Sequence, residues 1–176
     1  MARLSFWLIP AAQERAFFEA LIARLAHQYE APIFVPHVTV YASESTPEDD
    51  AAAILAQALA GMPPLHLRVT GIGYSKAFTQ TLFVRFAPCA ALEALSARLR
   101  ARLARPSPYV LQPHLSLLYK HLPAEEKRRL AATLTLPGPT VRFDTAAAIA
   151  AAAETRTRQD VERWQLVCTY PLPGPA

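Results

Sequence analysis

The chain carries one short pattern twice, and this internal repeat constrains its fold more than any other feature. Pro36-His37-Val38-Thr39-Val40 and Pro113-His114-Leu115-Ser116-Leu117 share a proline, a histidine and a hydroxyl residue in the same order. The two histidines are 77 residues apart (114 − 37), and the strand and helix patterns that precede them recur at the same offset. Self-similarity at a fixed period is typical of a duplicated unit. We therefore expect the 176 residues to form a single domain of two similar lobes, related by a pseudo-twofold axis.

Each copy is predicted to run strand, helix, strand, helix, strand, which makes an α+β fold. The strands of the first copy are expected at 4–9, 34–41 and 65–74, and its helices at 13–28 and 46–60. Those of the second copy are expected at 81–86, 111–119 and from 140, with helices at 90–105 and 123–134. The copies then span about 3–77 and 80–153, and a last strand within 161–170 completes a sheet. With no gap before the motif, Phe6 aligns with Phe83.

Three local patterns refine this prediction. Thr46-Pro47-Glu48-Asp49 is typical of a helix start. Threonine caps the first free N–H groups of a helix, proline suits the first helical position, and acidic residues in the first turn interact favourably with the helix dipole. Helical spacing predicts that Phe17, Leu21 and Leu25 form the apolar face of helix 13–28. Alanine favours helix over 145–153, but the place of this segment in the repeat favours strand, which we expect. Gly71 and Gly73 within a strand indicate a bulge or a close approach.

The two motifs together predict a site for one small anionic group. On a strand, residues i and i+2 share a face, so Thr39 lies beside His37 and Ser116 beside His114. A twofold axis brings both pairs to one cleft. Histidine titrates near neutrality, so one imidazole takes a proton from water while the other gives one to a leaving oxygen. The hydroxyls donate hydrogen bonds to phosphoryl oxygens. This set needs no metal or cofactor and suits the opening of a cyclic phosphodiester.

Other interpretations of the two motifs have less support. A metal site would need a third or fourth ligand, and a Ser-His-acid triad would need a nucleophile elbow; neither is visible. The remaining histidines have no counterpart at the repeat offset and are expected to be structural or on the surface: His27, His66 and His121. Cys89 and Cys168 belong to no motif, and whether they pair stays open.

Composition limits the class of protein. The chain is 52% hydrophobic and 18% charged, which supports a real core, and its net charge of +4 suits an anionic substrate. This charge is too small to indicate a nucleic-acid track. The first residues are predicted to form a strand and lack the cleavage site of a signal peptide. No apolar run is long enough to span a bilayer. We expect a cytoplasmic monomer with no membrane partner.

The twin motifs resemble those of the 2H phosphoesterase superfamily, and the chain looks most like its plant and yeast cyclic phosphodiesterases. Ser5-Phe6-Trp7-Leu8-Ile9-Pro10 is similar to the opening strand of that family, and Glu154-Thr155 with Trp164 to its closing segment. The resemblance covers nearly the whole length. It implies antiparallel sheets around a central cleft with helices outside, and a relation to the bacterial RNA 2′,3′-cyclic phosphodiesterases that also act as 2′-5′ RNA ligases.

The resemblance also implies roles for individual residues. His37 and His114 would be the acid–base pair, and Thr39 and Ser116 would bind the phosphate. Trp7, Tyr119 and Phe78 would line the substrate cleft; strict alternation turns Tyr119 away from Ser116 unless the strand ends there. The implied substrates are nucleoside 2′,3′-cyclic phosphates and ADP-ribose 1″,2″-cyclic phosphate. Two alternatives stay open: an enzyme acting on RNA ends, and a non-catalytic nucleotide- or RNA-binding protein.

Overall fold

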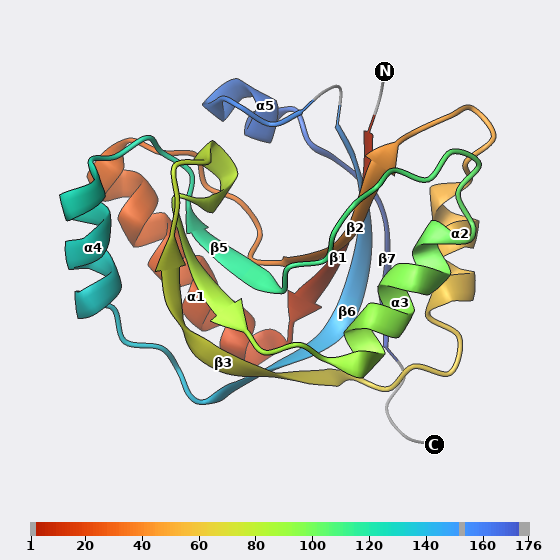
Figure 1. The fold of residues 1–176 in the computed structure, drawn as a ribbon, viewed down its shortest axis with the longest axis horizontal. Coiled ribbons are helices and arrows are strands. Elements are labelled where there is room, and N and C mark those ends of the chain that lie inside the picture. Colours follow the sequence, from red (N-terminus) through yellow and green to blue (C-terminus); the bar gives the residue numbers. More distant parts are fainter. Residues whose placement is uncertain (1–2, 152–153, 173–176) are drawn as a thin grey trace.

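The computed structural model describes residues 3–151 and 154–172. Its strands are β1 (Arg3–Pro10), β2 (Val38–Glu44), β3 (Leu65–Tyr74), β4 (Leu82–Phe86), β5 (His114–Leu118), β6 (Thr140–Ala151) and β7 (Gln165–Pro171). Its helices are α1 (Ala12–Tyr29), α2 (Ala51–Ala58), α3 (Ala90–Arg100), α4 (Ala124–Thr133) and α5 (Arg158–Glu162), and a 3-10 turn, η1 (Phe78–Gln80), precedes β4. The predicted α+β class and the repeated order of strands and helices are confirmed (Figure 1).

All strand pairs are antiparallel, and they connect the two copies of the repeat. The order is β1-β2-β5-β4-β3-β6-β7, and β6 also pairs with β1, so six strands close into a ring. The third strand of each copy pairs with the first strand of the other: β3 with β4, and β6 with β1. The copies therefore exchange their third strands. The lobe boundaries at 3–77 and 80–153 stay a prediction about the repeat.

The helices cover the outside of the strands, with α1 and α4 at one end of the view in Figure 1 and α2 and α3 at the other. They also cross between the copies, since α1 packs on β5 and α3 on β2. Leu92, Leu95 and Leu99 of α3 are buried, and the core contains large side chains from both copies, including Phe6, Phe18, Leu82 and Phe143. Each such side chain contributes about 1.5–3 kcal/mol to folding by leaving water.

The alanine segment forms a strand within the described residues. Ala147 pairs with Trp7 on β1 and with Thr169 on β7, so β6 is hydrogen-bonded along both edges. Hydrogen bonding and burial on both sides outweigh the helical propensity of alanine. The small side chains also leave room for the indole of Trp7, which packs against Ala147 and Ile149. Residues 152–153 of the predicted strand lie outside the described residues.

The predicted helix starts and faces need two corrections. Thr46 and Asp49 form a separate turn, in which the Asp49 carboxylate accepts from the Thr46 backbone N–H and hydroxyl. The helix α2 starts later, at Ala51, and the Asp50 carboxylate caps it by accepting hydrogen bonds from the backbone N–H groups of Ala52 and Ala53. In α1, Leu21 and Leu25 are buried as predicted, but Phe17 is 36% exposed and Phe18 is buried in its place.

The strand register corrects the gapless alignment. Trp7 lies opposite Thr39, and Phe83 lies opposite Ser116. Phe83 is therefore the structural counterpart of Trp7 at an offset of 76 (83 − 7), and Phe6 is not its equivalent. Both strand pairs have a bulge just before this position. The helix α5 was not foreseen, and the last strand is Gln165–Pro171.

The remaining sequence predictions concern single residues and segments. Gly71 has a φ of 143° at a bulge between β3 and β4, as the glycine pattern indicated. Cys89 and Cys168 are both free thiols. Of the helices in 3–151 and 154–172, none combines the length and the apolar character that a membrane crossing requires.

Candidate active site

The two motifs lie side by side where β2 of the first copy pairs with β5 of the second. Their one paired position is Val38 with Leu115. Extending this antiparallel register by one residue places His37 opposite Ser116 and His114 opposite Thr39. Opposite residues project to the same side of a sheet. The four side chains predicted from the sequence therefore gather around one point, with a local twofold relation between them.

Both imidazoles are oriented by the main chain in the same way. Nδ1 of His37 donates to the Val35 carbonyl at 2.7 Å, and Nδ1 of His114 donates to the Gln112 carbonyl at 2.6 Å. A carbonyl oxygen only accepts, so Nδ1 carries a proton in each ring. Nε2 is then the nitrogen that gains and loses a proton. In both motifs this is the nitrogen available to a substrate in the cleft.

The two imidazoles differ in their surroundings. His37 is 7% exposed and stacks on Trp7, with ring centroids 3.6 Å apart and an interplanar angle of 8°. Burial lowers its pKa to about 4, the Val35 carbonyl opposes this shift, and the nearby His114 adds to it. His114 meets the edge of Phe83 at 5.4 Å, and burial also lowers its pKa. Both rings are therefore kept neutral in the free protein, His37 more strongly.

The two hydroxyls also differ. Ser116 is buried, and its hydroxyl donates to the Thr79 carbonyl at 2.7 Å. Within the described residues the Thr39 hydroxyl has no hydrogen-bond partner, although its backbone carbonyl accepts from the Tyr109 phenol at 3.2 Å. Thr39 is thus ready to donate to a ligand, whereas Ser116 must first leave Thr79.

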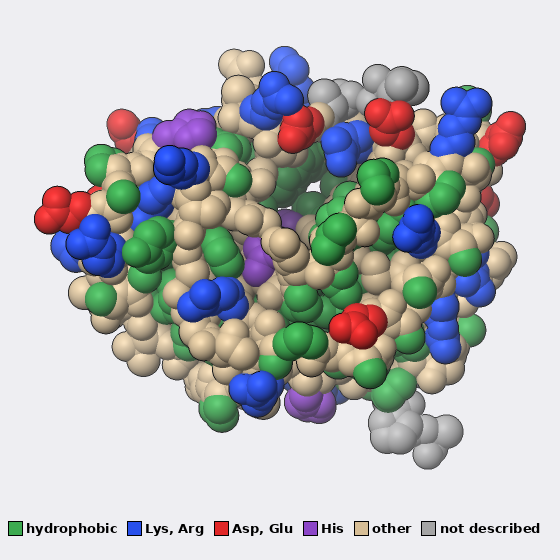
Figure 2. Space-filling view, viewed as in Figure 1, with side chains coloured by type: hydrophobic (Ala, Val, Ile, Leu, Met, Phe, Trp, Pro, Cys, Tyr) green, Lys and Arg blue, Asp and Glu red, His purple; other side chains and the backbone are tan. Residues whose placement is uncertain are grey.

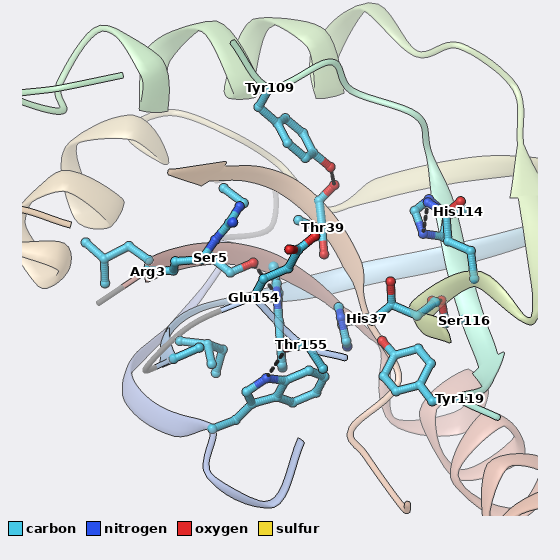
Figure 3. Close-up of a pocket in the computed structure, with 18 residues that line it drawn as sticks. Arg3, Ser5, His37, Thr39, Tyr109, His114, Ser116, Tyr119, Glu154 and Thr155 are labelled. Carbon is cyan, nitrogen blue, oxygen red and sulfur yellow. Dashed lines mark hydrogen bonds between the residues drawn. The ribbon is translucent and has the colours of Figure 1, made fainter. Parts of the chain in front are cut away.

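These side chains line one cleft. Figure 2 shows it as a hollow in which histidine surface is visible, and Figure 3 shows His37, His114, Ser116 and Tyr119 around the same space. The lining residues are Arg3, Leu4, Ser5, Trp7, His37, Thr39, Ala42, Thr79, Gln80, Tyr109, His114, Ser116, Tyr119, Ile149, Ala151, Glu154, Thr155 and Trp164. Six of the seven residues proposed for the site therefore lie together.

The aromatic residues fall into two groups. Trp7 lines the cleft, and Tyr119 also lines it because β5 ends at Leu118, which frees the next residue from strand alternation. Burial raises the pKa of the Tyr119 phenol, so it stays protonated. Phe78 is not among the lining residues: its ring lies 5.8 Å from that of Tyr119, and its neighbours Thr79 and Gln80 line the cleft in its place.

Sequence reasoning did not identify several cleft residues. Gln80 places its amide nitrogen 3.3 Å from Nε2 of His114, and Arg3 lies on the same face of β1 as Ser5 and Trp7. No motif marks either one, because they reach the cleft through the turn η1 and the first residues of β1. The other histidines, His27, His66 and His121, are exposed. Within the described residues, no three His, Cys, Asp or Glu side chains gather as a metal site would require.

Comparison with known proteins places this cleft in a family. The model of the 2′-5′ RNA ligase superfamily matches residues 10–162, which is most of the chain. The chain belongs to this superfamily. As a 2H phosphoesterase it is an enzyme of phosphoester chemistry, and the resemblance inferred from the twin motifs is confirmed.

Relatives of this 2H phosphoesterase cover nearly its full length. It is 29% identical over 175 residues to the Arabidopsis thaliana protein named cyclic phosphodiesterase, covering 96% of this chain and 94% of that one. A crystal structure named only as a phosphoesterase matches with a TM-score of 0.60 at 20% identity, covering 98% and 99% of the two chains. E. coli LigT in complex with 3′-AMP matches with a TM-score of 0.56 at 20% identity, covering 97% and 98%. These structures share its fold.

Proposed function

We propose that this protein is a metal-independent cyclic phosphodiesterase that opens nucleoside 2′,3′-cyclic phosphates. The observation that carries the proposal is the convergence of two Nδ1-anchored imidazoles and two hydroxyls on one cleft. A cyclic phosphodiester needs one base for water, one acid for the leaving oxygen and donors for the phosphoryl oxygens. The four motif residues supply all three.

The difference in burial supports a division of roles between the two histidines. His37 is the more strongly neutral ring and acts as the base, taking a proton from water as the water oxygen bonds to phosphorus. His114 is less buried, and the negative phosphate favours its protonated form. As the P–O bond to the ribose breaks, His114 gives its proton to the leaving oxygen. Thr39 and Ser116 donate to the remaining phosphoryl oxygens. The product is a phosphomonoester, and exchange with solvent restores both rings.

One experiment tests the activity directly. The protein is incubated with the four 2′,3′-cyclic nucleotides and with ADP-ribose 1″,2″-cyclic phosphate in the presence of a chelator, and phosphorus NMR identifies the product isomer. His37→Ala and His114→Ala are each expected to lower turnover by at least about 10²–10⁴-fold while the fold stays intact, as circular dichroism would check. His27→Ala, on the exposed side of α1, is the matched control. Absence of turnover by the wild type, or full turnover by either cleft variant, overturns the proposal.

A second candidate, an enzyme acting on RNA ends, is favoured by the shape of the cleft. From Trp7 the cleft continues along β1 past Ser5 to Arg3, which is about 13 Å for four strand residues. This extension offers the Arg3 guanidinium, with the Glu154 carboxylate nearby, to the part of a substrate beyond the cyclic phosphate. The E. coli LigT complex shows that the shared fold holds a nucleotide in that protein.

The two candidates differ in their response to substrate length. An RNA-end enzyme prefers a cyclic-ended oligonucleotide to a cyclic mononucleotide, and this preference falls with salt. Arg3→Ala then lowers kcat/KM for the oligonucleotide alone, whereas Arg24→Ala on the exposed side of α1 changes neither. Equal kcat/KM values for the two substrates at every salt concentration would remove this candidate.

A further inference from the structure

The two motifs are equivalent in sequence, but only the second is contacted by the turn that precedes β4. The Thr79 carbonyl accepts from the Ser116 hydroxyl, and the Gln80 amide nitrogen lies 3.3 Å from Nε2 of His114. Within the described residues no side-chain amide contacts His37; its ring lies against Trp7 and meets Trp164 edge-on at 6.0 Å. The local twofold symmetry of the site is therefore broken at Gln80.

The contact involves the reactive nitrogen of His114. Nδ1 of that ring is engaged with the Gln112 carbonyl, so the Gln80 amide approaches the nitrogen that exchanges a proton. A neutral Nε2 has one lone pair and accepts from the amide N–H. Once Nε2 is protonated it no longer accepts a hydrogen bond, so the amide N–H is released and can donate to an acceptor bound beside the ring.

The turn that carries Gln80 is held in place by several hydrogen bonds. The Ser75 hydroxyl donates to the Gln80 carbonyl at 2.9 Å and accepts from the Ala77 N–H at 3.0 Å. The ammonium of Lys127, a residue only 5% exposed, donates to the Ser75 carbonyl at 2.6 Å. Gln80 therefore extends from a fixed backbone, and its amide is oriented before substrate arrives, which is what a donor to a developing charge requires.

We propose that Gln80 is a further catalytic residue, whose amide N–H donates a hydrogen bond to a phosphoryl oxygen beside the one that His114 protonates. This inference rests on the proposed cyclic phosphodiesterase activity. In the free protein the same amide donates to the neutral imidazole and so disfavours its protonated form. On binding, the amide passes from the imidazole to the substrate, which leaves His114 free to carry the proton it delivers.

Two substitutions that preserve the length of the side chain test the proposal. Gln80→Met removes the donor and is expected to lower kcat by about 10²-fold, with a smaller change in KM. Gln80→Glu replaces the donor by an anion, so KM for the negatively charged substrate is expected to rise as well. Gln28→Ala, at the exposed end of α1, is the matched control and keeps wild-type values.

A pH measurement separates a direct contact from a structural one. In Gln80→Glu the carboxylate stabilises the imidazolium, so the pKa of His114 is expected to rise, and the limb of the kcat/KM profile that depends on it moves to higher pH. The other titratable and charged groups facing His114 are His37 across the cleft, Arg85 opposite it on β4, and the phenols of Tyr109 and Tyr119. None of these groups is altered in the variant.

The outcomes distinguish this proposal from the function on which it rests. If the wild type turns over cyclic nucleotides and Gln80→Met keeps its kcat, Gln80 is not catalytic and the inference is overturned. If the wild type is inactive, the proposed function fails, and NMR titration of His114 in the free protein still tests the contact. An unchanged His114 pKa in Gln80→Glu overturns the contact itself, and a raised one supports it.

Discussion

The indole of Trp7 lies flat against the imidazole of His37, with ring centroids 3.6 Å apart. Both residues are almost fully buried, and burial is the main reason that the pKa of His37 falls to about 4. In the proposed mechanism the stack therefore has a chemical role besides packing. It keeps one imidazole of the pair in the neutral form that a general base needs at neutral pH.

Replacing this indole should return the imidazole toward its ordinary titration. In Trp7→Leu water reaches one face of the ring, and the pKa of His37 is expected to rise from about 4 toward 6.5. Trp7→Phe keeps an aromatic cover and should stay close to the wild type. NMR titration of the histidine ring protons measures the difference. A pKa that stays near 4 in Trp7→Leu would show that the indole does not exclude water from His37.

The low pKa of His37 also predicts how stability depends on pH. Below about pH 6.5 the unfolded chain binds a proton on this histidine, whereas the folded chain does so only near pH 4, so stability falls as the pH drops through that window and is fully present above it. A shift from 6.5 to about 4 corresponds to roughly 3 kcal/mol.

Urea unfolding at pH 7 and pH 4.5 checks this dependence. His37→Gln has no group that titrates there, so its unfolding free energy should fall by about 2–3 kcal/mol less than that of the wild type. His27→Gln, on the surface, should behave as the wild type does. Equal losses in the wild type and His37→Gln would contradict the prediction.

The two hydroxyls should separate activity from stability. Thr39→Val removes a hydroxyl that has no partner within the described residues, so kcat should fall by about 10²–10³-fold with little change in melting temperature. Ser116→Ala removes a comparable donor and also breaks the part-buried hydrogen bond to the Thr79 carbonyl, which costs about 0.5–1.5 kcal/mol. Turnover assays and thermal melts of the two variants check both effects. An equal loss of stability in both would mean that the Thr39 hydroxyl has a structural partner.

Gly73 should tolerate no side chain. A Cβ there would lie 2.7 Å from the ring of Phe83, which itself meets the edge of His114. Gly73→Ala is expected to destabilise the protein by about 1–3 kcal/mol, because the Phe83 ring has to move. Gly138→Ala, whose nearest neighbour is 3.9 Å away, is the control. The free energies of unfolding of the two variants test this prediction. Equal values would show that the Phe83 ring moves aside at no cost.

The twin motifs made most of the site predictable from the sequence. His37, Thr39, His114 and Ser116 were predicted to converge, and the repeat also predicted a strand where the alanines alone favour a helix. These features follow from periodicity and chain order. Tyr119 needed one additional condition, the end of β5 at Leu118, which the sequence could state but not decide.

The other features depend on tertiary contacts. The bulges before Trp7 and Phe83 change the register by one residue, and no local pattern marks them. Asp50 caps α2 because the preceding Thr46–Asp49 segment closes a turn of its own. Gln80 reaches His114 through a turn held by Lys127, which is 52 residues away from Ser75 in the chain. Pairing across such distances leaves no trace in short-range spacing.

In each motif a peptide carbonyl holds the imidazole by Nδ1, from Val35 in one case and Gln112 in the other. In a Ser-His-Asp triad an aspartate performs this orienting task and brings a full negative charge with it. A peptide group fixes the tautomer equally well and has no net charge. The anionic ester therefore meets no repulsion from the groups that aim the two rings at it.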